Sequence, residues 1–132
     1  MTDTRLSEDV KKFIVEHINS LEQLEVLLLL HRHPQQEWTA HDVSQELRIA
    51  PASAAVRLAD LQTGGLVAVS EASDPLYRYH PQKPDFEPTV NSLAKGYAEY
   101  RVTVINLIFS KPLDKIQTFA DAFKFRKDKD DG

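Results

Sequence analysis

The sequence contains no cysteine, which excludes disulfide bonds, thiolate nucleophiles and zinc sites built on cysteine ligands. Long apolar runs are also missing: the longest covers residues 26–30, against the roughly 20 residues that a membrane-spanning helix needs. No basic and apolar targeting signal opens the chain. The 42% hydrophobic and 27% charged residues are ordinary for a globular core. We therefore expect one small cytoplasmic domain with no membrane contact.

Catalytic and metal-binding motifs are absent as well. There is no glycine-rich phosphate loop, no nucleophile elbow and no His-Glu-x-x-His sequence. His31 and His33 have His-x-His spacing, with His41 nearby, but histidines at a helix C-terminus are favoured by the helix dipole alone. No carboxylate at close spacing completes a ligand set around them. We expect no enzyme, no metal site and no cofactor.

Positive charge is scarce in the middle of the chain. The formal net charge is −4, and residues 21–80 hold four arginines against eight acidic residues. Residues 81–132 are nearly balanced, with nine basic and eight acidic residues. Binding to DNA through its phosphates requires lysine and arginine in number. The central segment is therefore poorly supplied for tight, purely electrostatic binding to nucleic acid.

Three helix-start signals divide the first half of the chain. Ser7 precedes two acidic residues, Ser20 is followed three positions later by Gln23, and Thr39 is followed in the same way by Asp42. The last two pairs are typical of capping boxes, in which Gln23 would reach back to the amide of Ser20. Apolar residues at helical spacing follow each start. We expect three helices from these signals.

A further helix and a hairpin are expected next. Residues 53–62 have helical spacing, and Gly64 and Gly65 follow as residues that accept a positive φ at a helix end. Residues 66–70 (LVAVS) and 76–80 (LYRYH) are β-prone and are separated by turn-forming residues. This order predicts a mainly α-helical fold with a small β-wing, a winged helix-turn-helix.

The C-terminal part should extend this fold. Residues 81–88 (PQKPDFEP) form a linker with three prolines, and the pattern after it predicts one long helix over about residues 89–110. Pro112 should end this helix, and a last amphipathic stretch follows over residues 113–123. The final RKDKDDG alternates in charge and lacks apolar anchors, which is typical of disorder. The predicted organisation is an N-terminal helix (1–19), a winged helix-turn-helix domain (20–81), a linker with dimerisation helices (82–125) and a disordered tail (126–132).

The segment over residues 47–67, LRIAPASAAVRLADLQTGGLV, resembles the bacterial winged helix-turn-helix regulators that include the multiple-antibiotic-resistance and arsenic-resistance repressors. The resemblance spans about residues 21–80 and rests on an apolar frame: Leu47, Ile49, Leu58, Leu61, Gly65, Leu66 and Val67. It implies that the helix after the turn enters the major groove of DNA while the wing touches the backbone or the minor groove. The sequence departs from the family at Arg48, where glycine is common, and at Ala50, where a small polar residue is common.

Carried over by position, the resemblance implies DNA contacts from Thr39, Ser44, Gln45, Arg48, Ser53, Arg57 and Arg78. Arg57 is the candidate base reader, because arginine makes bidentate hydrogen bonds to guanine. The alternative for Arg57 is an ion pair with Asp60 on the same helix face. Arg78 would contact a phosphate from the wing or remain a solvated strand residue. The other outward residues of this helix are mostly alanines, which offer no hydrogen bonds to bases.

A dimer is expected from the C-terminal helix. Over residues 102–109 the apolar positions surround nearly the whole helix, which then needs cover on more than one side. A second protomer is the simplest cover, and the candidate interface residues are Tyr97, Arg101, Val104, Ile105, Ile108 and Phe109. Arg101 would form an interface ion pair, with Glu99 or an acid of the partner, or extend its head to water.

Two functions remain open at this level. The first is a transcriptional regulator that forms a homodimer through the long C-terminal helix and the first helix and binds double-stranded DNA, with half-sites about 10 bp apart. The second is a winged-helix protein-interaction module, in which the acidic domain binds a basic protein partner, for example a part of the transcription machinery, without reading DNA. The fold favours the first function. The outward surface of the helix over residues 53–62, which offers few hydrogen-bonding groups, favours the second.

Overall fold

The computed structural model describes residues 6–110. In this range the chain forms six helices and a two-stranded antiparallel sheet, which confirms the predicted mainly α-helical fold with a small β-wing, although one predicted helix is divided in two. In chain order the elements are α1 (Glu8–His17), α2 (Leu21–Arg32), α3 (Ala40–Leu47), α4 (Pro51–Thr63), β1 (Val67–Ser70), β2 (Leu76–Tyr79), α5 (Phe86–Glu99) and α6 (Arg101–Ser110).

The three predicted helix starts are confirmed, with one change of partner. Ser7 caps α1, and Thr39 and Asp42 form a reciprocal capping box at α3. The Ser20 hydroxyl accepts a hydrogen bond from the amide of Gln23 at 3.0 Å. The Gln23 side chain, however, accepts from the amide of Asn19 at 2.6 Å and not from that of Ser20. The same side chain donates to the carbonyl of His17 in α1, so it joins α1 to α2, while the Ser20 hydroxyl caps α2.

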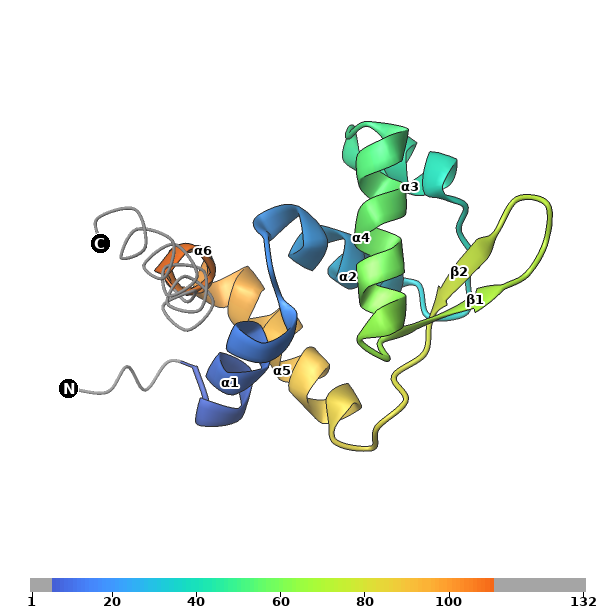
Figure 1. The fold of residues 1–132 in the computed structure, drawn as a ribbon. Coiled ribbons are helices and arrows are strands. Elements are labelled where there is room, and N and C mark those ends of the chain that lie inside the picture. The colour runs from blue at the N-terminus through green and yellow to red at the C-terminus, as the bar shows by residue number, and fades with distance from the viewer. Residues whose placement is uncertain (1–5, 111–132) are drawn as a thin grey trace, which may run out of the picture.

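Helix α2 lies at the centre of the molecule (Figure 1). On one side it packs against α3, α4 and the sheet, and on the other lie α1, α5 and α6, which contact one another. The five apolar residues over 26–30 are all buried, because α2 is covered on more than one side. One continuous apolar core therefore joins the two halves of the chain.

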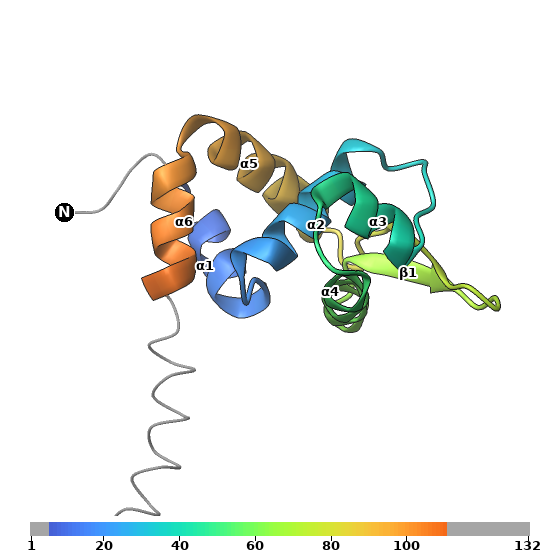
Figure 2. The same ribbon diagram turned by 90° about the horizontal axis from the view of Figure 1, so that it is seen from above.

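The hairpin forms the wing. Its register pairs Val67 with Tyr79 and Ala68 with Arg78. Trp38, which precedes α3, adds a single bridge by exchanging two backbone hydrogen bonds with Tyr77 at 2.8 and 2.7 Å. Leu66, Val67 and Tyr79 are buried at the base of the hairpin. The wing is thereby fixed to the helices at its base, while its tip extends away from them (Figure 2).

The prediction of one long helix over residues 89–110 is wrong. The helix ends at Glu99, and Tyr100, with φ −132° and ψ 52°, separates α5 from α6. The two helices meet at a sharp angle, which lets α6 run back along α1 (Figure 2). This turn brings Val104 and Ile108 into the core together with Val90. No proline or glycine stands at position 100, so local sequence gave no sign of the break.

Two expectations fall outside the described residues: the amphipathic stretch over 113–123 and the tail over 126–132. Within residues 6–110, no helix has both the length and the apolar character required to cross a membrane.

Candidate nucleic-acid interface

Helices α3 and α4 form a helix-turn-helix. Val43 of α3 is fully buried, as are Leu58 and Leu61 of α4, so the two helices share one apolar contact. The turn between them is residues 48–50, and Arg48 adopts a left-handed conformation with φ 59° and ψ 48°. Among residues 6–110 it is the only non-glycine residue with a positive φ. Glycine adopts this left-handed conformation without a steric penalty, whereas Arg48, which has a Cβ atom, adopts it at an energetic cost.

The outward face of α4 is apolar and uncharged over most of its length. Ala52, Ala55 and Ala59 are exposed, and the side chain of Val56 is 52% exposed. Pro51 begins the helix, which requires no amide hydrogen bond at that position. Ser53, at the edge of this face, is half-buried. Hydrogen-bond donors for base edges are therefore few on this helix.

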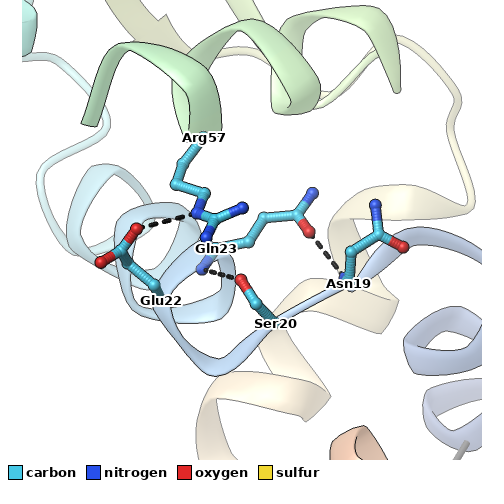
Figure 3. A network of polar contacts seen from close by, with 5 residues as sticks. All are labelled: Asn19, Ser20, Glu22, Gln23 and Arg57. Atoms are coloured by element: carbon cyan, nitrogen blue, oxygen red, sulfur yellow. Dashed lines mark hydrogen bonds and ion pairs between the residues drawn. The ribbon is translucent and has the colours of Figure 1, made fainter. Parts of the chain in front are cut away.

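Arg57, the single basic residue of α4, does not extend from this face. Its Nε donates to the Glu22 carboxylate of α2 at 2.8 Å, and both side chains are 29% exposed (Figure 3). Neither prediction for Arg57 anticipated this partner, since Asp60 on the same helix is not involved. Glu22 lies 35 positions earlier, and no local pattern connects the two residues. The structure adds Glu22 to the candidate site.

Arg78 lies on the wing and is exposed, opposite Ala68 on β1. Arg48 is likewise exposed, at the turn before α4. Between the start of α3 and the end of β2, residues 40–79, these two guanidinium groups are the exposed ones, since Arg57 is half-buried. The hairpin tip between the strands contributes the exposed acids Glu71 and Asp74. The candidate interface therefore carries little positive charge.

Of the remaining residues predicted to contact DNA, Gln45 is exposed and available. Thr39 is half-buried, and its hydroxyl accepts from the amide of Asp42 at 2.9 Å. Ser44 is buried with 5% of its surface exposed, and its hydroxyl donates to the carbonyl of His41 at 2.7 Å. The expectation that Ser44 contacts a phosphate is corrected by this burial. Ser44 is buried next to Val43 on the inward side of α3, whose first turn is fixed by the capping box of Thr39 and Asp42.

A second polar cluster joins α2 to the C-terminal helices. The Tyr97 hydroxyl donates to Glu25 at 3.3 Å, and the Arg101 guanidinium lies 3.8 Å from the same carboxylate. Arg101 also lies over the Tyr97 ring, 4.9 Å from its centre. Burial raises the pKa of Tyr97, and the nearby Glu25 carboxylate raises it further. Arg101 thus pairs within its own chain, with Glu25 and not with the predicted Glu99.

The predicted interface residues of α6 separate into two groups. Val104 and Ile108 are buried inside the protomer, so they belong to its core and are not open to a partner. Phe109 is 70% exposed and Ile105 is half-buried. Val102, which the prediction of interface residues omitted, is 69% exposed. Val102 and Phe109 are seven residues apart, so they lie on the same face of α6 with Ile105 near them.

No group of three or more histidine, aspartate or glutamate side chains within residues 6–110 is arranged to hold a metal ion. His31 instead contacts Asn91 of α5 at 2.7 Å and meets the Tyr79 ring edge-on.

No protein-family model matches the chain, and no curated protein sequence matches it. Solved structures do. The homodimeric winged helix-turn-helix DNA-binding domain Mb0332 of Mycobacterium bovis, described as a possible ArsR-family transcriptional regulator, is 20% identical with a TM-score of 0.52, covering 76% of this chain and 93% of that one. The heme sensor PefR of Streptococcus agalactiae is 14% identical with a TM-score of 0.53, covering 89% and 78%. The adhesin competence repressor AdcR of Streptococcus pyogenes is 18% identical with a TM-score of 0.51, covering 84% and 82%.

At these identities the likeness concerns the fold. The likeness extends over most of the chain, since the three matches cover 76%, 89% and 84% of it. The fold expected from the apolar frame over residues 47–67 is confirmed. This chain has the winged helix-turn-helix fold that is described for Mb0332.

Proposed function

We propose that the protein is a transcriptional regulator that binds double-stranded DNA as a homodimer. The observation that carries this proposal is the pairing of α4 with the wing. An exposed helix after a tight turn is flanked by a hairpin with an exposed arginine, which is the arrangement that docks a helix in the major groove and a wing on the backbone.

The charges on this face determine how the protein would bind. Arg78 would contact phosphates from the wing, and Arg48 and Gln45 would do so from the turn and from α3. With so few cations, a protomer neutralises on the order of three to five phosphates at most, so affinity should depend only shallowly on salt. Ser53 and the methyl groups of Ala52 and Ala55 would supply contacts to base edges, thymine methyl groups in particular. DNA shape would contribute the rest of the specificity.

The dimer is supported by the exposed apolar side chains of α6. Among residues 6–110, Val102 and Phe109 are two of the three large hydrophobic side chains that remain exposed. The solution structure of Mb0332, which shares the fold, is homodimeric. A two-fold dimer through α6 would present two copies of α4 to neighbouring major grooves of a near-palindromic site.

Selection from a random-sequence duplex DNA library at low salt tests the function. We expect enrichment of a near-palindromic motif whose half-site centres lie about 10 bp apart. Arg78→Ala should then weaken binding to the selected duplex several-fold and reduce its salt dependence by about one charge. Lys95→Ala is the matched control, because it removes one exposed positive charge from α5, on the opposite half of the fold.

Absence of enrichment, together with absence of any retardation of duplex DNA at low salt, would refute the proposal. In that case the exposed apolar face of α4 would be better explained by a protein partner.

A further inference from the structure

The ion pair between Glu22 and Arg57 lies where α2 and α4 approach each other. Arg57 is the only lysine or arginine on α4, the helix proposed to enter the major groove. Its Nε is occupied by Glu22 at 2.8 Å, and the guanidinium is held against α2 and away from the outward face (Figure 3). Arg57 is thus the one group on this helix suited to read guanine, and folding places it beside a carboxylate.

The two partners of this ion pair differ in their freedom to move: Glu22 lies in a fixed turn of α2, whereas Arg57 has a long side chain that can rotate. Glu22 is in the first turn of α2, which is fixed by the Ser20 cap and by the hydrogen bonds of Gln23 to the preceding loop (Figure 3). A carboxylate at a helix N-terminus is also stabilised by the helix dipole. Arg57 has a long side chain with 29% of its surface exposed, so rotation about side-chain bonds can bring the guanidinium away from Glu22. A partly exposed ion pair of this kind is weak, so its competition with a phosphate or a base for Arg57 should lower DNA affinity by a small factor and not abolish binding.

We propose that Glu22 sets the DNA affinity of this protein by withholding Arg57 from the nucleic acid. This inference rests on the proposed function and names Glu22 as an affinity-determining residue that acts through Arg57. With Glu22 present, Arg57 contributes little to binding. With Glu22 removed, the guanidinium is free to reach a base or phosphate next to α4.

The test measures binding of a selected DNA duplex by fluorescence anisotropy at several salt concentrations. Glu22→Ala should bind about fivefold more tightly than the wild type, with a salt dependence steeper by about one charge. Arg57→Ala should change wild-type affinity by less than about twofold. The double variant Glu22→Ala with Arg57→Ala should keep only the part of the gain in affinity that comes from removing a negative charge. The rest of the gain, which requires Arg57, should disappear.

Asp60→Ala is the matched control for that charge. Asp60 is exposed on α4, one turn beyond Arg57, and removal of its carboxylate also reduces repulsion from DNA. Its effect should persist in the Arg57→Ala background, whereas the excess effect of Glu22→Ala should not. Glu22→Gln keeps the size of the side chain and should give a smaller gain in DNA affinity in the same direction. It tests the same prediction if Glu22→Ala does not fold.

The outcomes separate the two proposals. If the wild type binds DNA but Glu22→Ala gains no more than Asp60→Ala, or gains equally without Arg57, the role of Glu22 is overturned and the proposed function stands. If neither the wild type nor any variant binds duplex DNA at low salt, the proposed function fails, and the role of Glu22 fails with it.

Discussion

Tyr79 shows at the scale of one residue how folding can leave a polar group unsatisfied. Its ring is buried at the base of the wing, and its hydroxyl has no hydrogen-bond partner among the described residues. Burial raises the pKa of Tyr79 to about 12 from an ordinary value of 10, and the Glu87 carboxylate adds to this effect. The folded state therefore favours the neutral phenol and is weakened by its ionisation.

Tyr79→Phe should stabilise the protein or leave its stability unchanged, with a gain of up to about 2 kcal/mol, because the buried hydroxyl no longer has to lose its water. Because the pKa of Tyr79 is raised in the folded state, part of the free energy of unfolding of the wild type depends on the neutral phenol. That part is complete below pH 10 and is lost as the pH rises toward 12. Urea unfolding at pH 7 and pH 11 measures both effects. The variant should lose less stability than the wild type between these pH values. A loss of 2 kcal/mol or more at pH 7 would show that the hydroxyl has a partner.

Gly65 matters at the scale of elements, because it directs the chain from α4 into β1. Its φ is +81°, and a Cβ atom there would lie 3.1 Å from the side chain of Gln82. Gly64, directly before it, has an ordinary φ of −76°, and a Cβ atom there would make only ordinary van der Waals contacts, of which the shortest is 3.5 Å to the carbonyl oxygen of Asp60. The sequence places two glycines at this point, and the backbone requires the second.

Gly65→Ala should therefore lower the free energy of unfolding by about 1–2 kcal/mol, since a left-handed conformation is costly for an L-residue with a side chain. Gly64→Ala is the matched control and should be neutral or stabilising by up to about 1 kcal/mol. Thermal or urea unfolding of the two variants measures the difference. Equal destabilisation by both substitutions would contradict the assignment.

The elements also show where local sequence is sufficient. The starts of α1, α2 and α3 follow from Ser7, Ser20 and Thr39, because a side-chain cap needs only residues three positions apart. The break at Tyr100 does not follow from local sequence. It exists because Val104 and Ile108 gain burial against α1, which belongs to the other end of the chain. A straight helix would satisfy the local pattern equally well.

The whole molecule is expected to be a dimer. Val102→Glu combined with Phe109→Glu should yield a monomer, because two charges would be buried in the proposed interface without partners. Light scattering should give the wild type about twice the chain mass of 15.0 kDa and the variant about that mass itself. Val56→Glu is the control: it places a charge on the third exposed hydrophobic residue, on α4, and should leave the dimer intact while weakening DNA binding. A wild-type monomer at micromolar concentration would contradict the dimer.

Local sequence alone sets the order of the elements from α1 to the hairpin and the winged helix-turn-helix frame, because caps, glycine positions and apolar spacing act over a few residues. The tertiary structure decided how the candidate site residues are used. It buried Ser44, turned Val104 and Ile108 into the core and paired Arg57 with Glu22 across 35 positions. Those outcomes depend on which helices come to lie side by side, and that arrangement is set by burial of the whole apolar core and not by the neighbours of any one residue.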